Sequence, residues 1–165
     1  MSRVSTKGFT IAELLIALAI TAMLCTAVAI AINASSINYN VNRDMFEANN
    51  RARGALVRMS SQLRTAKAVD PNAQSDGITL IAADDSNITF KYDSGDEKLY
   101  LVTNDDTTDA DYVLCEKVSA MNFEKNTAVV DEMTIVENVL ISMTVSAGDV
   151  QQSHTASAVI RRNLR

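Results

Sequence analysis

The first part of the chain contains one uninterrupted apolar segment. Residues Phe9–Ile32 read FTIAELLIALAITAMLCTAVAIAI, with Glu13 as the one charged side chain and with neither Pro nor Gly. A helix of this length rises about 36 Å, which exceeds the roughly 30 Å of a bilayer's hydrocarbon core. The pattern therefore predicts a membrane-spanning helix. The alternative is a buried core helix of a soluble domain, whose unbroken apolar run seldom exceeds about 14 residues.

A helical period continues beyond this segment. Apolar side chains recur at intervals of four and three residues, which places them on one face of a helix. They are Val41, Met45, Ala48, Ala52, Leu56, Met59, Leu63 and Ala66. Asp70-Pro71-Asn72 ends the pattern, because proline disfavours helix in the residue before it. We therefore predict one helix from about Phe9 to about Val69, with residues 33–69 as its amphipathic part and residues 70–76 as the candidate linker.

After Pro71 the period changes to two, which is typical of strands. The predicted strands are Ile78–Ala83, Ile88–Tyr92, Lys98–Val102, Tyr112–Lys117, Ala120–Lys125, Val139–Ala147 and Thr155–Arg161. Asp93–Asp96 and Ala147–Asp149 predict turns in which glycine supplies the positive φ. One antiparallel sheet over residues 70–165, packed on the amphipathic helix, would bury both apolar faces. The predicted fold class is α+β.

Charge is distributed unevenly along the 165 residues, whose formal net charge is -5. Residues 33–69 carry six cations and two acids, whereas residues 70–165 carry seven cations and seventeen acids. A sequence pI near 4.8 argues against general nucleic-acid binding, which requires a basic surface. The helical stem is therefore basic and the predicted sheet region acidic.

A short basic leader precedes the apolar segment. Arg3 and Lys7 are the only charges before Phe9, and they predict a cytoplasmic N-terminus with the C-terminal 133 residues outside. A cleaved signal peptide is the alternative, but its apolar region is usually about 7–15 residues long. Glu13 lies five residues into the helix, where a carboxylate costs a few kcal/mol and needs a partner. A cut between Gly8 and Phe9 would create an α-amino group about one helical turn away.

Residues Lys7-Gly8-Phe9-Thr10-Ile11-Ala12-Glu13, followed by the apolar helix, resemble the class III signal of type IV pilins and type II secretion pseudopilins. The resemblance implies that prepilin peptidase removes residues 1–8 by cutting after Gly8 and N-methylates Phe9. It also implies that Glu13 pairs with the N-terminal amine of an adjacent subunit, so that two buried charges neutralise each other. The implied fold is the pilin-like lollipop, in which residues 9–32 form the membrane and filament-core helix.

The strand region is most similar to W-type minor pilins and J-type minor pseudopilins, through the segments 88–92, 99–102, 118–123, 139–145 and 158–163. The resemblance implies a single-pass inner-membrane protein with a periplasmic or extracellular head. Such a protein is assembled at low copy at the tip of a type IV pilus or type II secretion pseudopilus. Its partners would be prepilin peptidase, other minor and major pilins, the inner-membrane assembly platform and membrane lipid.

A second function class is a membrane-anchored binding module for adhesion or DNA uptake. The acidic head carries few aromatic side chains, which argues against direct nucleic-acid contact. The five cations between Arg51 and Lys67 allow two interpretations. They form a solvated face favoured by the helix dipole, or they meet acidic surfaces of neighbouring subunits.

Few residues offer catalytic or metal-binding chemistry. His154 is the one histidine, so we expect neither a His-based zinc site nor a catalytic triad, and we expect no enzyme activity and no cofactor. We expect His154 in a solvated loop or at a strand end. Cys25 and Cys115 lie far apart along the chain, which predicts free thiols, with Cys115 buried.

An acidic cluster lies between two predicted strands and consists of Asp105, Asp106, Asp109 and Asp111. Calcium binds several carboxylate oxygens, and some pseudopilins bind it in such loops. The spacing lacks the Asp-x-Asp-x-Asp-Gly order of a calcium loop. We therefore predict a solvated acidic loop without a metal, with calcium binding as the alternative.

Overall fold

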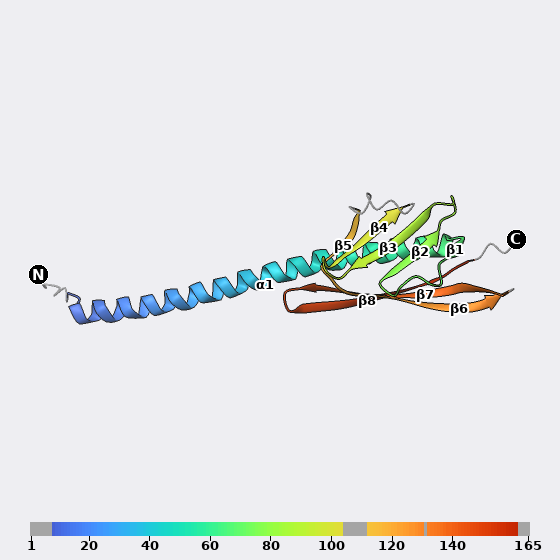
Figure 1. Ribbon diagram of the computed structural model, residues 1–165. Coiled ribbons are helices and arrows are strands. Elements are labelled where there is room, and N and C mark those ends of the chain that lie inside the picture. The colour runs from blue at the N-terminus through green and yellow to red at the C-terminus, as the bar shows by residue number, and fades with distance from the viewer. Residues whose placement is uncertain (1–7, 104–111, 131, 162–165) are drawn as a thin grey trace, which may run out of the picture. The chain divides into compact units, whose positions relative to one another are not determined.

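The structure is a computed structural model that describes residues 8–103, 112–130 and 132–161. Within these ranges it contains one helix and eight strands (Figure 1). In chain order they are α1 (Ile11–Thr65), β1 (Ala68–Val69), β2 (Gly77–Ile81), β3 (Asn87–Asp93), β4 (Lys98–Thr103), β5 (Val113–Glu116), β6 (Val118–Val130), β7 (Met133–Ala147) and β8 (Val150–Val159). The chain divides into two compact units, residues 1–40 and 41–165. The α+β fold class is confirmed.

The amphipathic face of α1 is buried as its spacing predicts. Its buried side chains are Met45, Ala48, Ala52, Ala55, Leu56, Met59 and Leu63. The predicted end of the helix is wrong, since α1 stops at Thr65 and Ala68–Val69 form β1. The N–H groups of Lys67 and Asp70 donate to carbonyls of β2, at 2.8 and 2.9 Å, so pairing with the sheet replaces the last helical turn.

The strands form two antiparallel sheets, where the sequence predicted one. Strands β1 to β5 pair in chain order, and β6, β7 and β8 pair separately. The long β6–β7 hairpin was also missed in part, because its outer half pairs residues 126–130 with residues 133–138, where no strand was predicted. That segment mixes Asn, Glu and Thr with Val and Ile, without strict alternation of apolar and polar residues. The two-residue period that indicates a strand is therefore missing there.

Lys117 alone separates the two sheets along the chain. It follows β5 and precedes β6, and its φ of 61° lies in the left-handed region. Its carbonyl accepts a hydrogen bond from the N–H of Ser146 in β7 at 2.9 Å, and the N–H of Val118 donates to the carbonyl of Glu97 at 2.9 Å. The chain therefore leaves one sheet and enters the other within a single residue.

Buried side chains from α1 and both sheets form one hydrophobic cluster in the unit of residues 41–165. The largest that are almost fully buried include Phe90, Met59, Leu63 and Ile141. The two predicted turns are confirmed, but glycine supplies the positive φ only at Gly148, at 59°. In the β3–β4 turn the positive φ, 54°, belongs to Glu97, and Gly95 donates its N–H to the Asp93 carboxylate at 2.8 Å.

Candidate processing and assembly site

The segment around the predicted cleavage position contains a helix start with a specific cap. Residues 8–10 are non-helical, and α1 begins at Ile11. The backbone N–H and the hydroxyl of Thr10 each donate to Glu13 Oε2 at 3.2 Å. The N–H of Glu13 donates to Thr10 Oγ1 at 3.2 Å. This reciprocal pattern is a capping box, which satisfies N–H groups that the first helical turn leaves unpaired.

The cap gives Glu13 a local role that the sequence interpretation missed. The sequence did contain a signal for this cap, because Thr10-x-x-Glu13 has the spacing of a capping box. A carboxylate in the first turn also interacts favourably with the helix dipole. In the chain with its leader, the Glu13 carboxylate is therefore held by Thr10 of its own chain.

The peptide bond between Gly8 and Phe9 is accessible. Phe9 exposes 81% of its surface, and Gly8 is exposed as well. A Cβ built on Gly8 would have no heavy atom within 4 Å. No side chain or backbone atom in the described part of the chain therefore excludes a larger residue at position 8.

The apolar part of α1 is exposed along its length. It contains a stretch that is long and apolar enough to cross a membrane, and none of that stretch is buried. Its two threonines satisfy their hydroxyls within the helix, since Thr21 donates to the Ala17 carbonyl at 2.8 Å and Thr26 to the Ala22 carbonyl at 2.9 Å. Such internal bonds lower the cost of placing a hydroxyl in an apolar environment. These properties are those of a single-pass membrane anchor.

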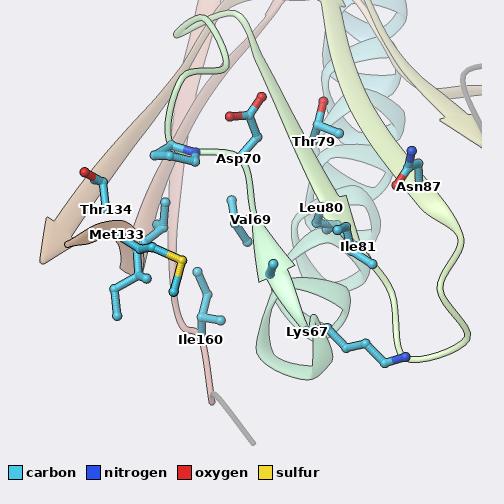
Figure 2. Close-up of a pocket in the computed structure, with 14 residues that line it drawn as sticks. Lys67, Val69, Asp70, Thr79, Leu80, Ile81, Asn87, Met133, Thr134 and Ile160 are labelled. Carbon is cyan, nitrogen blue, oxygen red and sulfur yellow. The ribbon is translucent and has the colours of Figure 1, made fainter. Parts of the chain in front are cut away.

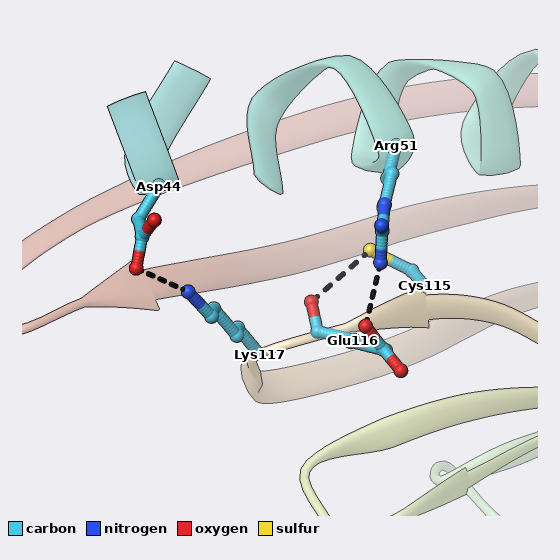
Figure 3. Close-up of polar contacts among 5 residues, drawn as sticks. All are labelled: Asp44, Arg51, Cys115, Glu116 and Lys117. Carbon is cyan, nitrogen blue, oxygen red and sulfur yellow. Dashed lines mark hydrogen bonds and ion pairs between the residues drawn. The ribbon is translucent and has the colours of Figure 1, made fainter. Parts of the chain in front are cut away.

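The basic stem of α1 is tied to the strands that surround it. Arg51 forms an ion pair with Glu116 at 2.5 Å, and Lys117 forms one with Asp44 at 2.9 Å (Figure 3). The Lys117 ammonium group lowers the pKa of Asp44 through its hydrogen bond and its charge. Both pairs join α1 to the segment in which the chain passes from β5 to β6.

Three further cations near the end of α1 also bind within the chain. The Arg58 guanidinium lies 5.0 Å from the ring centroid of Tyr112 and donates to its hydroxyl at 3.0 Å. Arg64 donates to the Ser157 carbonyl of β8 at 3.4 Å, and Lys67 pairs with Asp85 at 2.5 Å. Four of the five cations between Arg51 and Lys67 therefore contact the head itself. Neither sequence-based interpretation of these cations anticipated that use.

His154 lies inside β8, not in a loop or at a strand end, so its predicted location is wrong. The ring is half-buried, and Nε2 lies 2.8 Å from Asn49 Oδ1 of α1. Burial, and secondarily the nearby Arg53 charge, lower the pKa of His154. The histidine thus serves as a polar contact between helix and sheet.

The two cysteines are free, as predicted, and Cys115 is buried. The acidic cluster of Asp105, Asp106, Asp109 and Asp111 lies outside the described residues. Elsewhere in the described ranges, no group of three or more His, Cys, Asp or Glu side chains is arranged to hold a metal ion. The calcium alternative stays a prediction.

Comparison with known protein families gives a match in the segment described above. Residues 3–29 match the family described as the prokaryotic N-terminal methylation motif. No curated protein and no solved structure matches the chain. The match includes the leader, Gly8, Phe9, the capping box and most of the apolar helix. The chain therefore carries the class III N-terminal signal of type IV pilins and pseudopilins.

Proposed function

We propose that the protein is a minor pilin or pseudopilin. It is cleaved after Gly8 by prepilin peptidase, methylated at the new N-terminus of Phe9, and assembled at low copy at the tip of a type IV pilus or type II secretion pseudopilus. The observation that carries this proposal is the methylation motif at residues 3–29 on an exposed, unpartnered apolar helix. An apolar face of this extent needs lipid or other helices to cover it. The proposed role is structural, not enzymatic.

In this proposal the uncut protein is a single-pass protein of the inner membrane. Arg3 and Lys7 keep the leader on the cytoplasmic side, and residues 70–165 form the periplasmic or extracellular head. The inner-membrane assembly platform then moves the subunit from lipid into a filament of other pilins. The resemblance of the strand region to W-type and J-type minor subunits supports the minor role.

Glu13 has two successive partners in this scheme. In the uncut chain Thr10 holds its carboxylate through two hydrogen bonds. Cleavage creates a charged amine on Phe9, and the amine of an adjacent subunit becomes the partner in the filament. An unpaired carboxylate in an apolar core is costly, whereas a carboxylate paired with an amine is tolerated.

Two variants test processing and assembly separately in cells that express a prepilin peptidase and a pilus or pseudopilus system. In the wild-type protein, mass spectrometry should find Phe9 at the N-terminus with one added methyl group. Gly8→Leu should remain uncut in the membrane fraction. Glu13→Gln should be cut normally but should be missing from sheared filaments, because its amide cannot neutralise the amine.

Gly54→Ala is the control for Gly8→Leu, because a Cβ at Gly54 also has no heavy atom within 4 Å. It should be processed and assembled like the wild-type protein. An intact leader on the wild-type protein would overturn the proposal. Normal processing without recovery in any filament fraction would favour the membrane-anchored binding module for adhesion or DNA uptake.

A further inference from the structure

The start of α1 lies close to the Gly8–Phe9 bond. Residues 8–10 are non-helical, α1 begins at Ile11, and the N–H of Leu14 donates to the Thr10 carbonyl at 3.2 Å. An α-helix leaves its first four N–H groups without intrahelical partners. A start one turn earlier would give these groups carbonyl partners, but it would also place the Gly8–Phe9 bond inside the helix. The position of the start therefore decides the conformation of that bond.

Local hydrogen bonds fix this start. Thr10 donates from its N–H and its hydroxyl to Glu13 Oε2, and the Glu13 N–H donates to Thr10 Oγ1, each at 3.2 Å. The described cavities, such as the one of about 390 Å³ beside β1, β2 and β7 (Figure 2), are lined by residues of the unit 41–165. None of them encloses residues 8–13. The capping box is therefore the described interaction that sets where α1 begins.

Gly8 acts in the same direction as the capping box. Glycine is a poor helix residue, because a helix takes more conformational freedom from it than from any other residue. A Cβ at Gly8 would meet no heavy atom within 4 Å, so lack of space is not what glycine answers here. If the cap is lost in lipid or detergent, the helix should extend, because shortening it would expose unpaired N–H groups to an apolar environment. Gly8 and Thr10 therefore both oppose extension of α1 toward the leader.

We propose that Thr10 is a positioning residue for prepilin peptidase. Its capping box stops α1 at Ile11 and so keeps the Gly8–Phe9 bond in the non-helical form that the peptidase cuts. Proteases act on chain that is exposed and free of helical hydrogen bonds. The cut is a hydrolysis, in which water adds across the amide and leaves the Gly8 carboxylate and the Phe9 amine. The inference rests on the proposed function, because it requires cleavage after Gly8.

Two substitutions separate capping from recognition of the threonine side chain itself. Asparagine is a good N-cap with a different shape, whereas valine has nearly the shape of threonine and is a poor N-cap. The full chain in detergent is mixed with purified prepilin peptidase, and mass spectrometry follows the initial rate of cutting. Thr10→Asn should be cut within about twofold of the wild-type rate. Thr10→Val should be cut about fivefold more slowly, which corresponds to the roughly 1 kcal/mol that an N-cap contributes.

Two further variants serve as controls. Thr21→Val is matched to Thr10→Val, because Thr21 also bonds to the helix backbone, through the Ala17 carbonyl at 2.8 Å, but lies three turns from the cut. It should be cut at the wild-type rate. Glu13→Gln should be cut at that rate as well, since glutamine completes a capping box as glutamate does.

Amide hydrogen exchange of the same chains, without peptidase, reports where α1 begins. In the wild-type structure no described carbonyl accepts the N–H of Ala12, so this amide should exchange quickly. In Thr10→Val an extended helix would pair it with the Gly8 carbonyl, four residues earlier. Its exchange should then slow by about fivefold, in step with the rate of cutting. In Thr10→Asn and Thr21→Val it should remain fast.

The outcomes distinguish this inference from the proposed function. An uncut wild-type chain would overturn both. A wild-type chain that is cut, with Thr10→Val cut equally fast, would overturn the inference alone. Cutting of Thr10→Asn as slow as that of Thr10→Val would mean that the peptidase contacts threonine directly, and faster exchange of Ala12 in Thr10→Val would mean that α1 shortens. Either result would also overturn the inference and leave the proposed function standing.

Discussion

Lys117 shows how one residue can combine a backbone role with a side-chain role. Its backbone has a φ of 61° where the chain passes from β5 to β6, a conformation that costs a residue with a Cβ roughly 1–2 kcal/mol. Its ammonium group meanwhile binds Asp44 of α1. Glycine would suit the turn better, but it would lose this ion pair. Because position 117 is occupied by lysine, neither glycine nor proline marks the point where the chain passes from one sheet to the other. This passage could therefore not be predicted from the sequence.

Substitution separates the two roles. Lys117→Ala and Lys117→Gly both remove the ion pair, but only glycine relieves the left-handed backbone. We expect the glycine variant to be more stable than the alanine variant by about 0.5–1 kcal/mol. This difference is what remains after the conformational entropy that glycine adds to the unfolded chain offsets part of the relief. Guanidinium unfolding followed by tyrosine fluorescence measures the difference. At Lys91, an exposed β3 position without positive φ, the order should reverse, and the same order at both sites would contradict this account.

At the scale of elements, α1 is the part that the sequence predicts best. Intervals of three and four residues identified its buried face, because only one face of a helix can meet a core. Its C-terminal end could not be predicted in this way. Ala68 and Val69 fit a helix and a strand equally well, and the hydrogen bonds to β2 that decide between them come from residues at least nine positions away.

The buried face of α1 should dominate the stability of the head. Met59 has no exposed surface, so Met59→Ala leaves a cavity and should cost about 2–5 kcal/mol. Val57 lies on the same helix with 68% of its surface exposed, and Val57→Ala should change the unfolding free energy by less than about 0.5 kcal/mol. Chemical unfolding in detergent compares the two. A similar loss for both variants would mean that α1 is not packed as described.

At the scale of the whole molecule, the sequence predicted the regions of distinct composition along the chain better than it predicted the contacts between residues. The α+β class, the apolar helix and the basic stem could all be predicted from periodicity and charge counts. The partners of the stem cations could not, because Arg51, Arg58 and Arg64 contact residues more than fifty positions away. At the proposed processing site, a local motif that matches residues 3–29 made Gly8, Phe9 and Glu13 candidates from the sequence alone.

The titratable groups of the head set limits on stability at both ends of the pH range. Burial lowers the pKa of His154 below its ordinary 6.5. The hydrogen bond and the charge of Lys117 lower the pKa of Asp44 below 3.8, and hydrogen bonds from Ser86 do the same for Asp84. The unfolded state therefore binds more protons in acid, and stability falls as pH decreases. Burial raises the pKa of the Cys115 thiol from 9.0 to about 11. As pH rises, this thiol therefore loses its proton in the unfolded state before it does so in the folded state.

The unfolding midpoint should consequently be flat from about pH 7 to 9 and should fall on both sides. On the acid side the decline begins below pH 6.5, where His154 becomes protonated. It steepens below pH 3.8, where Asp44 and Asp84 become protonated as well. On the alkaline side Cys115 causes the decline from pH 9.0 toward 11, and Tyr92, whose pKa burial raises above 10.0, adds to it. Cys115→Ala should lower stability at every pH but should delay the alkaline decline until tyrosine ionises, while leaving the acid side unchanged. An alkaline decline in Cys115→Ala that still begins at pH 9.0 would show that the buried thiol does not cause it.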